Sequence, residues 1–175
     1  MHRKLLTLVF VILLFAGAEF VLSTTTALPE RVASHFGAGG QANGYMTRDG
    51  YRWFMLFFAV GFPLLMVLAI AGLPRLIPQY TNLPNREYWL APERRDQAFD
   101  FLTTHALWFG CLIEVFICSV HWHVVQANAQ SPPRLANGPF LMSLGLFLAA
   151  LVVWIIMLMR QFRIPLRDLR TSNMQ

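Results

Sequence analysis

The chain has 175 residues, of which 56% are hydrophobic and 13% charged, and its formal net charge at pH 7 is +5. A soluble domain carries about 25% charged residues, so this composition excludes a water-soluble globular protein. It also excludes intrinsic disorder, because disordered chains combine low hydrophobicity with high net charge. We therefore expect a protein embedded in a lipid bilayer, with room for four or five spans at about 20 residues each.

Four apolar stretches meet the length that a bilayer requires, and they cover residues 5–23, 53–73, 101–125 and 139–159. At 1.5 Å per residue, a helix over any of them crosses the roughly 30 Å of hydrocarbon. Pro63 would break a helix in water, but neighbouring helices satisfy freed backbone groups in lipid. The predicted fold is an all-α membrane protein with four transmembrane helices, forming a single domain over residues 1–175.

The first stretch has an alternative interpretation as a secretory signal peptide. Residues 2–4 are basic, and residues 16–18, Ala-Gly-Ala, have the small-residue pattern of a cleavage site. The apolar residues continue past that pattern as far as Leu22, which is longer than the apolar core of a signal peptide needs to be. This continuation favours a span that is retained in the mature protein.

The distribution of basic residues predicts the orientation. One set of ten lies in the N-terminus, in the loop between the second and third stretches and in the tail: Arg3, Lys4, Arg75, Arg86, Arg94, Arg95, Arg160, Arg163, Arg167 and Arg170. The other two loops hold four: Arg31, Arg48, Arg52 and Arg134. Because cytoplasmic loops are enriched in Lys and Arg, both termini are predicted to be cytoplasmic. The positive charge then reflects topology and anionic lipid, so no nucleic-acid partner is predicted.

The loop between the first two stretches is too polar and too rich in glycine to lie in the membrane. Its glycines permit left-handed backbone conformations, and Asn43-Gly44 is a strong signal for a hairpin turn. Phe36 and Tyr45 give the loop apolar surfaces that fit against helix ends. We expect a compact, turn-rich cap on the outer face, with a tight turn at Asn43-Gly44.

The same loop carries a recognisable motif. It reads Leu28-Pro29-x-x-Val32-x-x-His35-Phe36, followed by a glycine at position 40 and by Asn43-Gly44. Over residues 28–53 this pattern resembles the small membrane domain of unknown function at the N-terminus of SdpI-type bacterial immunity and signalling proteins, which also occurs alone in short multi-span proteins. The resemblance implies a multi-pass protein of the bacterial cytoplasmic membrane, and it names no reaction.

The loop between the second and third stretches contains four prolines, Pro74, Pro78, Pro84 and Pro92. They prevent a single helix up to residue 91, because each proline removes a backbone donor and disfavours helix at the preceding residue. Pro92 followed by Glu93 is typical of a helix start, so we expect a helix from Pro92 that continues into the third stretch. The segment Asn82-Leu83-Pro84-Asn85-x-x-Tyr88-Trp89 also resembles a feature of the SdpI-type family.

Glu114 is the most unusual residue of the third stretch, because a charge at the bilayer centre costs about 3 kcal/mol on insertion scales. At about 100° per residue, one helix face carries Thr103, Leu107, Gly110, Glu114, Cys118 and His121, whereas the opposite face carries His105 and His123. The favoured interpretation is a protonated Glu114 that is hydrogen-bonded to a neighbouring helix. The alternative is a proton or ion pathway.

Glu19, His35 and His121 are expected near the outer end of the bundle, where they form a hypothetical zinc site. Imidazole and carboxylate groups are suitable zinc ligands. However, His121 and His123 point about 200° apart on a helix, and neither a His-Glu-x-x-His nor a Cys-x-x-Cys spacing is present. No cofactor is therefore predicted, and zinc is kept as the alternative.

The distinctive residues lie mainly in loops, and the sequence signatures of common catalytic sites are absent. The sequence thus favours a non-enzymatic binding, sensing or immunity-type module, or a subunit of a membrane complex. Candidate binding residues are His35, Phe36, Asn43, Gly44, Tyr45 and Arg48 in the outer loop, and Asn85, Tyr88 and Trp89 in the inner loop. Besides the bilayer, the expected partner is another membrane protein or a peptide ligand, and a homo-oligomer is a further alternative. The alternative is a metal-dependent membrane enzyme or a proton- or ion-coupled transporter that uses the outer His/Glu cluster and Glu114.

Overall fold

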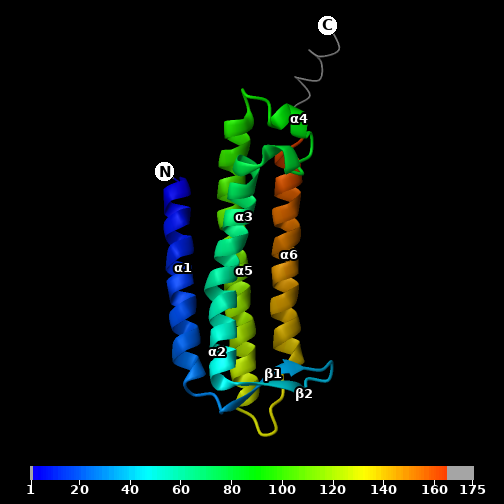
Figure 1. The fold of residues 1–175 in the computed structure, drawn as a ribbon. Helices are drawn as coiled ribbons and strands as arrows, with labels where there is room; N and C mark the ends of the chain where they lie inside the picture. The colour runs from blue at the N-terminus through cyan, green and yellow to red at the C-terminus, as the bar shows by residue number, and fades with distance from the viewer. Residues whose placement is uncertain (1, 165–175) are drawn as a thin grey trace.

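A computed structural model describes residues 2–164 as a helical bundle with a small β-hairpin at one end (Figure 1). The long helices are α1 (His2–Thr25), α2 (Arg48–Leu56), α3 (Phe62–Leu76), α5 (Arg95–Asn128) and α6 (Asn137–Gln161). Short elements complete the chain: β1 (Arg31–Phe36), β2 (Ala42–Thr47), the π-helix η1 (Phe57–Gly61), the 3-10 helix η2 (Pro78–Tyr80) and α4 (Arg86–Trp89). We call the two ends of the bundle the hairpin end, which carries β1 and β2, and the proline-loop end, which carries η2 and α4.

The prediction of four helices that are long and apolar enough to cross a membrane is confirmed. Within the described residues they cover 3–25, 48–76, 95–128 and 137–161, and each includes one of the predicted apolar stretches. All four extend beyond the apolar residues at both ends. The longest, α5, has 34 residues and is therefore about 50 Å long, which exceeds the roughly 30 Å thickness of bilayer hydrocarbon.

The second span continues through a proline. α2, η1 and α3 follow one another without a break, and Pro63 lies in the first turn of α3. A proline inside a helix lacks an N–H and pushes against the carbonyl one turn earlier. The turn before Pro63 is widened into the π-helix η1, in which the N–H of Phe62 bonds to the carbonyl of Phe57. The wider turn accommodates the proline without ending the span.

α5 is the central helix of the bundle. It packs against α1 and against the α2–η1–α3 segment on one side and against α6 on the other, so α1 and α6 lie at opposite edges (Figure 1). Apolar residues of α1, α3 and α5 form a buried cluster: Leu6, Phe10, Val67, Ala106, Leu107 and Cys111. A second cluster lies toward the hairpin: Val21, Leu28, Val32, Tyr51, Met55, Ala59, Ile117 and Val124. In contrast, α6 has no buried residue.

The predicted start of the third helical span at Pro92 is wrong by three residues. α5 begins at Arg95, and the preceding residues form a turn in which the carbonyl of Ala91 accepts the N–H groups of Arg94 and Arg95. The turn lets the chain fold back after α4, so that Trp89 and Ala98 lie in the same buried cluster. This tertiary contact decides where the helix begins.

Candidate functional site

The hairpin turn lies before the predicted position. β1 and β2 pair antiparallel, with Ala33 opposite Tyr45 and His35 opposite Gly44. The chain reverses between Gly37 and Gln41, where Gly40 has a left-handed backbone with φ of 80°. The prediction of the turn at Asn43-Gly44 is therefore wrong, because both residues belong to β2.

Gly44 and Gly40 are both required by close packing at the hairpin. A Cβ atom at Gly44 would lie 2.9 Å from the Cβ of His35 on the paired strand. A Cβ atom at Gly40 would lie 2.5 Å from the backbone oxygen of Leu135, in the loop that precedes α6. The absence of a side chain at Gly44 thus leaves room for His35 on the paired strand. Gly40 adopts the backbone conformation that the turn needs, and its lack of a side chain lets the α5–α6 loop lie close to the turn.

Side chains from the α5–α6 region fix the hairpin to the bundle. Asn128 of α5 accepts the N–H of Ala33 at 2.8 Å through Oδ1 and donates Nδ2 to the carbonyl of Ala33 at 2.9 Å. Asn128 thereby bonds the backbone N–H and C=O groups of Ala33 at the outer edge of β1, as a neighbouring strand would. At the tip, Asn137 donates to the carbonyl of Ala38 at 2.7 Å, and the N–H of Leu135 donates to the carbonyl of Gly40 at 2.8 Å. The hairpin is therefore held at its base and at its tip.

The exposed side of the hairpin combines polar and aromatic groups. The Nδ1 atom of His35 lies 2.5 Å from Oδ1 of Asn43, and the guanidinium of Arg31 lies 4.7 Å from the centre of the Tyr45 ring. His35 and Asn43 are exposed, and 43% of Tyr45 is exposed. We call these four residues, Arg31, His35, Asn43 and Tyr45, the hairpin face. They bring together three of the candidate binding residues of the outer loop.

Two other candidate residues of the outer loop, Phe36 and Arg48, take part in packing and in backbone hydrogen bonds. Phe36 is half-buried and packs against the apolar cluster beneath the hairpin. Arg48 is the first residue of α2, and its N–H donates to the carbonyl of Glu30 at 2.9 Å. With Glu30, Thr47 and Asp49 it lines a shallow polar depression at the base of the hairpin.

A buried chain of hydrogen bonds lies beneath the hairpin and is centred on His121, which is 0% exposed. The hydroxyl of Tyr51 lies 2.9 Å from Nδ1 of His121, and Oγ1 of Thr24 lies 2.6 Å from Nε2. The Thr24 hydroxyl donates to the carbonyl of Phe20 at 2.5 Å, so it accepts from Nε2–H, and Nδ1 accepts from the hydroxyl of Tyr51. This assignment satisfies every member of the chain with a neutral imidazole and joins α1, α2 and α5.

Glu114 lies at the contact between α5 and α1 and is 1% exposed. Its Oε1 atom accepts from the thiol of Cys118 at 3.4 Å and lies directly against Gly17, where a Cβ atom would overlap it. Within residues 2–164, Oε2 is buried without a hydrogen-bond partner. The prediction of a hydrogen bond to a neighbouring helix is thus wrong, since the bonded thiol belongs to α5 itself. The neighbouring helix instead contributes the glycine that leaves space for the carboxyl group.

The opposite face of α5 carries His105 and His123, as the helical spacing predicts, and both contact α6. Nε2 of His105 lies 2.9 Å from the carbonyl oxygen of Trp154, and the indole N–H of Trp154 donates to the carbonyl of His105 at 3.0 Å. Nε2 of His123 lies 3.0 Å from the hydroxyl oxygen of Ser143. These histidines therefore attach α6 to the bundle.

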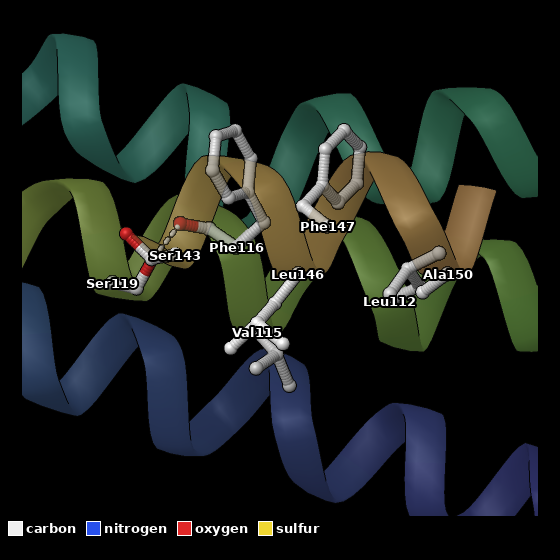
Figure 2. Close-up of a pocket in the computed structure, with 8 residues that line it drawn as sticks. All are labelled: Leu112, Val115, Phe116, Ser119, Ser143, Leu146, Phe147 and Ala150. Atoms are coloured by element: carbon white, nitrogen blue, oxygen red, sulfur yellow. Dashed lines mark hydrogen bonds between the residues drawn. The ribbon is translucent and has the colours of Figure 1, made fainter. Parts of the chain in front are cut away.

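Between these two attachments, α5 and α6 enclose an apolar groove that opens to the outside of the bundle (Figure 2). The rings of Phe116 and Phe147 stack across it with centres 4.3 Å apart and planes 14° apart. Ser119, on the α5 wall, directs its hydroxyl to the carbonyl of Phe116 at 2.8 Å, as the dashed line in Figure 2 shows. The groove thus presents mainly hydrocarbon, which suits contact with lipid chains.

The candidate residues of the inner loop take part in packing at the proline-loop end. Asn85 has a left-handed backbone and donates Nδ2 to the carbonyl of Phe162 at 2.8 Å. Trp89 is buried, and its ring meets that of Phe162 edge-on at 5.6 Å. Tyr88 is half-buried beneath the guanidinium of Arg94, 4.1 Å from the ring centre. Asn85 and Trp89 therefore dock α4 onto the end of α6.

The three residues of the hypothetical zinc site occupy different surroundings. Glu19 is exposed on α1, His35 is exposed on the hairpin, and His121 is buried with both ring nitrogens in hydrogen bonds. Within residues 2–164, no group of three or more His, Cys, Asp or Glu side chains is placed to hold a metal ion. The described residues thus do not bring the proposed ligands together.

Several residues that build the site carry no signal in the sequence. Thr24, Tyr51 and Asn128 are ordinary helix-end residues, and their importance arises from partners that lie 70 to 97 positions away along the chain. Gly17 could be noticed only as part of a small-residue pattern. Comparisons of the chain with models of protein families, with curated proteins and with solved structures found no match.

Proposed function

We propose that the chain is a multi-pass protein of the bacterial cytoplasmic membrane that acts as a non-enzymatic binding or sensing module of the SdpI-type kind, with the hairpin face as its recognition surface. Four helices of spanning length support the membrane part of this proposal. The motif over residues 28–53, which includes the whole hairpin, supports the family part. The partner is a peptide or a membrane protein that approaches from the outer side.

The distribution of charge supports an orientation with both termini in the cytoplasm. Among the described residues, eight Lys and Arg lie toward the proline-loop end: Arg3, Lys4, Arg75, Arg86, Arg94, Arg95, Arg160 and Arg163. Four lie toward the hairpin end: Arg31, Arg48, Arg52 and Arg134. Arg167 and Arg170, which count toward the first set, lie outside the described residues. This excess favours a cytoplasmic proline-loop end and an outer hairpin.

One observation carries the recognition proposal, namely that the bundle holds an exposed hairpin in a fixed conformation. An isolated two-stranded hairpin is only marginally stable in water. Here Asn128 and Asn137 bond its backbone at the base and at the tip. A surface that is already ordered loses less entropy when it binds, and loops on rigid scaffolds commonly carry recognition.

The geometry of β2 favours an extended peptide segment as the bound element. The N–H and C=O groups of Ala33 both bond to Asn128, so Ala33 and the opposite residue Tyr45 do not bond to each other. The backbone groups of Tyr45 therefore point to the free edge of β2. An extended segment can add there as a third strand, while the hairpin face contacts its side chains.

Site-specific photocrosslinking tests this surface. A photoreactive phenylalanine analogue replaces Tyr45, and a matched variant carries it at Tyr80, which is exposed at the proline-loop end. The expected result in native membranes is a discrete adduct at position 45 that is absent at position 80 and is lost when Asn43→Ala is added. Equal adduct patterns at the two positions, or no adduct at position 45, would contradict the recognition proposal.

Cysteine labelling tests the orientation separately. In a Cys111→Ser, Cys118→Ser background, Gln130→Cys reports on the hairpin end and Asn82→Cys on the proline-loop end, since both positions are exposed. We expect an impermeant maleimide added outside intact cells to label Gln130→Cys alone. Labelling of Asn82→Cys alone would reverse the orientation.

A further inference from the structure

The carboxyl group of Glu114 has surroundings that the recognition surface does not explain. It is almost completely buried in the middle of α5, and one of its oxygens has no hydrogen-bond partner among the described residues. The other oxygen receives only a thiol hydrogen bond from Cys118. An ionised carboxylate without a countercharge is strongly disfavoured in such a place, so the group needs a bound cation to be neutral.

The space beside Glu114 selects the smallest cation. Oε1 lies directly against the backbone of Gly17, and metal ions that prefer oxygen bind several ligands at once. The described residues place no group of three His, Cys, Asp or Glu side chains around it. A proton needs no further ligand and no extra room. The geometry therefore favours a carboxylic acid over a carboxylate paired with a metal ion.

Among residues 2–164, the polar side chains nearest to Glu114 along its face of α5 lie toward the hairpin end. Toward the hairpin end, Cys118 and His121 follow on the same face of α5 at one-turn intervals, and His121 continues to Tyr51 and Thr24. Toward the proline-loop end the next two turns of the same face, at Gly110 and Leu107, are apolar and tightly filled, and Thr103 lies beyond them. These two turns meet the buried cluster of Leu6, Phe10, Val67, Ala106, Leu107 and Cys111. A Cβ atom at Gly110 would lie 2.6 Å from Val67 and 2.7 Å from Phe10, which shows how closely the cluster packs.

The groups that face Glu114 are few. On α5 they are the thiols of Cys111 and Cys118 and, two turns away, the imidazole of His121. α1 presents Gly17, and its own acidic residue, Glu19, is exposed. The α2–η1–α3 segment also packs against this part of α5, and its residues 53–74 contain no acidic or basic side chain. α6 lies on the other side of α5 and meets His105 and His123 instead.

We propose that Glu114 is a proton-binding site that exchanges its proton with the hairpin side of the membrane along the face of α5 that carries Cys118 and His121, where His121 is the centre of a separate hydrogen-bond chain. The neutral imidazole of His121 suits this role, because it accepts a proton at one nitrogen and releases one from the other. Tyr51 and Thr24 hold the ring in place through hydrogen bonds to its two nitrogens. The apolar cluster separates the site from the proline-loop side.

A hydrophobic carbodiimide, dicyclohexylcarbodiimide, tests both parts of the proposal. It dissolves in the bilayer and reacts with a carboxylic acid, whose O–H adds across one C=N bond to give an acylisourea and then a stable acylurea. The carboxylate form does not react in this way. Mass spectrometry of the digested protein locates the adduct, so the readout needs no knowledge of the binding partner.

We expect labelling of Glu114 in membrane vesicles at neutral pH. Glu114→Gln removes the adduct, and the matched variant Glu19→Gln retains it. A folded wild-type protein that does not react at Glu114, or whose labelling is suppressed by sodium at constant pH, would overturn the proton site.

The direction of exchange is tested by raising the pH on one side of sealed vesicles at a time, from about 6 to about 9. The cysteine-labelling test above identifies the hairpin side. The acid form of a carboxyl declines about tenfold per pH unit once it ionises, so labelling should decrease severalfold when the hairpin side alone is made alkaline. Raising the pH on the proline-loop side alone should leave it unchanged. The opposite asymmetry, an equal response to both sides, or no response would overturn the exchange path.

Variants of the chain locate the path. Tyr51→Phe removes one hydroxyl with little change in shape, and His121→Gln keeps a polar group that cannot relay a proton. Both should still be labelled at Glu114 at low pH on both sides, which shows that the site is intact. Both should lose most of the response to alkaline pH on the hairpin side. An undiminished response in both variants would show that the proton takes another route.

Discussion

The two faces of α5 hold their neighbouring helices in different ways. Toward α1 and α3, the face with Gly110, Glu114 and His121 is buried, and α1 approaches so closely that Gly17 touches a carboxyl oxygen. Toward α6, the contacts are separate hydrogen bonds and several aromatic contacts, and no residue of α6 is buried. We call these the α1 seam and the α6 seam. The comparison shows that the tightest packing surrounds the polar groups and continues beneath the hairpin.

Replacing a histidine should affect the α1 seam far more than the α6 seam. His121→Leu leaves the buried hydroxyl of Tyr51 without its partner, which costs about 1–3 kcal/mol, whereas the half-buried hydroxyl of Thr24 keeps its bond to the carbonyl of Phe20. His123→Leu breaks one half-buried contact to Ser143, which is worth about 0.6 kcal/mol in membrane proteins. Unfolding in detergent at increasing denaturant measures the difference. Equal losses would mean that the two seams do not differ as described.

Replacing a glycine by alanine compares the packing of the α1 seam with that of α6 by adding a single methyl group. At Gly17 a methyl group would overlap the Glu114 carboxyl, whereas at Gly145 of α6 nothing lies within 4 Å. Overfilling a packed site costs about 1–3 kcal/mol, so Gly17→Ala should destabilise the protein and Gly145→Ala should not. Both changes raise helix propensity, which makes Gly145→Ala a matched control. A stable Gly17→Ala protein would show that the α1 seam is looser than its distances indicate.

The smallest expected effect concerns the stacked rings of Phe116 and Phe147 in the α6 seam. Phe147→Leu removes the ring that lies on Phe116, and such pairs contribute about 0.5–1.5 kcal/mol beyond the area they bury. Because lipid chains can occupy the groove beside the pair, we expect a loss at the lower end of this range. Crosslinking between cysteines introduced in α5 and α6 would reveal any larger separation. Loss of α6 from the bundle would contradict a seam that also rests on His105 and His123.

Much of this architecture follows from the sequence, because a lipid environment restricts the backbone conformations that an apolar segment can adopt. A long apolar stretch has to be helical, since hydrocarbon offers no partner for free backbone groups. The faces of α5 were also predictable, because the spacing of Glu114 and His121 against His105 and His123 places them on opposite sides of any helix. Both conclusions depend on local pattern and need no knowledge of the neighbouring helices.

The remaining features depend on contacts between distant parts of the chain. Asn43-Gly44 and the glycines before it are both good turn signals, and the choice between them depends on Leu135, which approaches Gly40. The hydrogen bonds of His121 require Thr24 and Tyr51, two common residues in separate helices. The partner of Glu114 was wrongly predicted because a carboxyl group beside Gly17 meets backbone rather than a side chain. Such pairings emerge only when the helices are assembled.

The bundle holds the hairpin as a fixed surface, and amide hydrogen exchange at Ala33 tests this most directly. In the wild-type protein in lipid nanodiscs, this amide is bonded to Asn128 and should exchange slowly. Asn128→Ala should speed its exchange markedly, whereas Asn137→Ala, which removes a contact only at the hairpin tip, should leave it unchanged. Exchange at Ala33 in the wild type as fast as in an unstructured peptide would contradict the account.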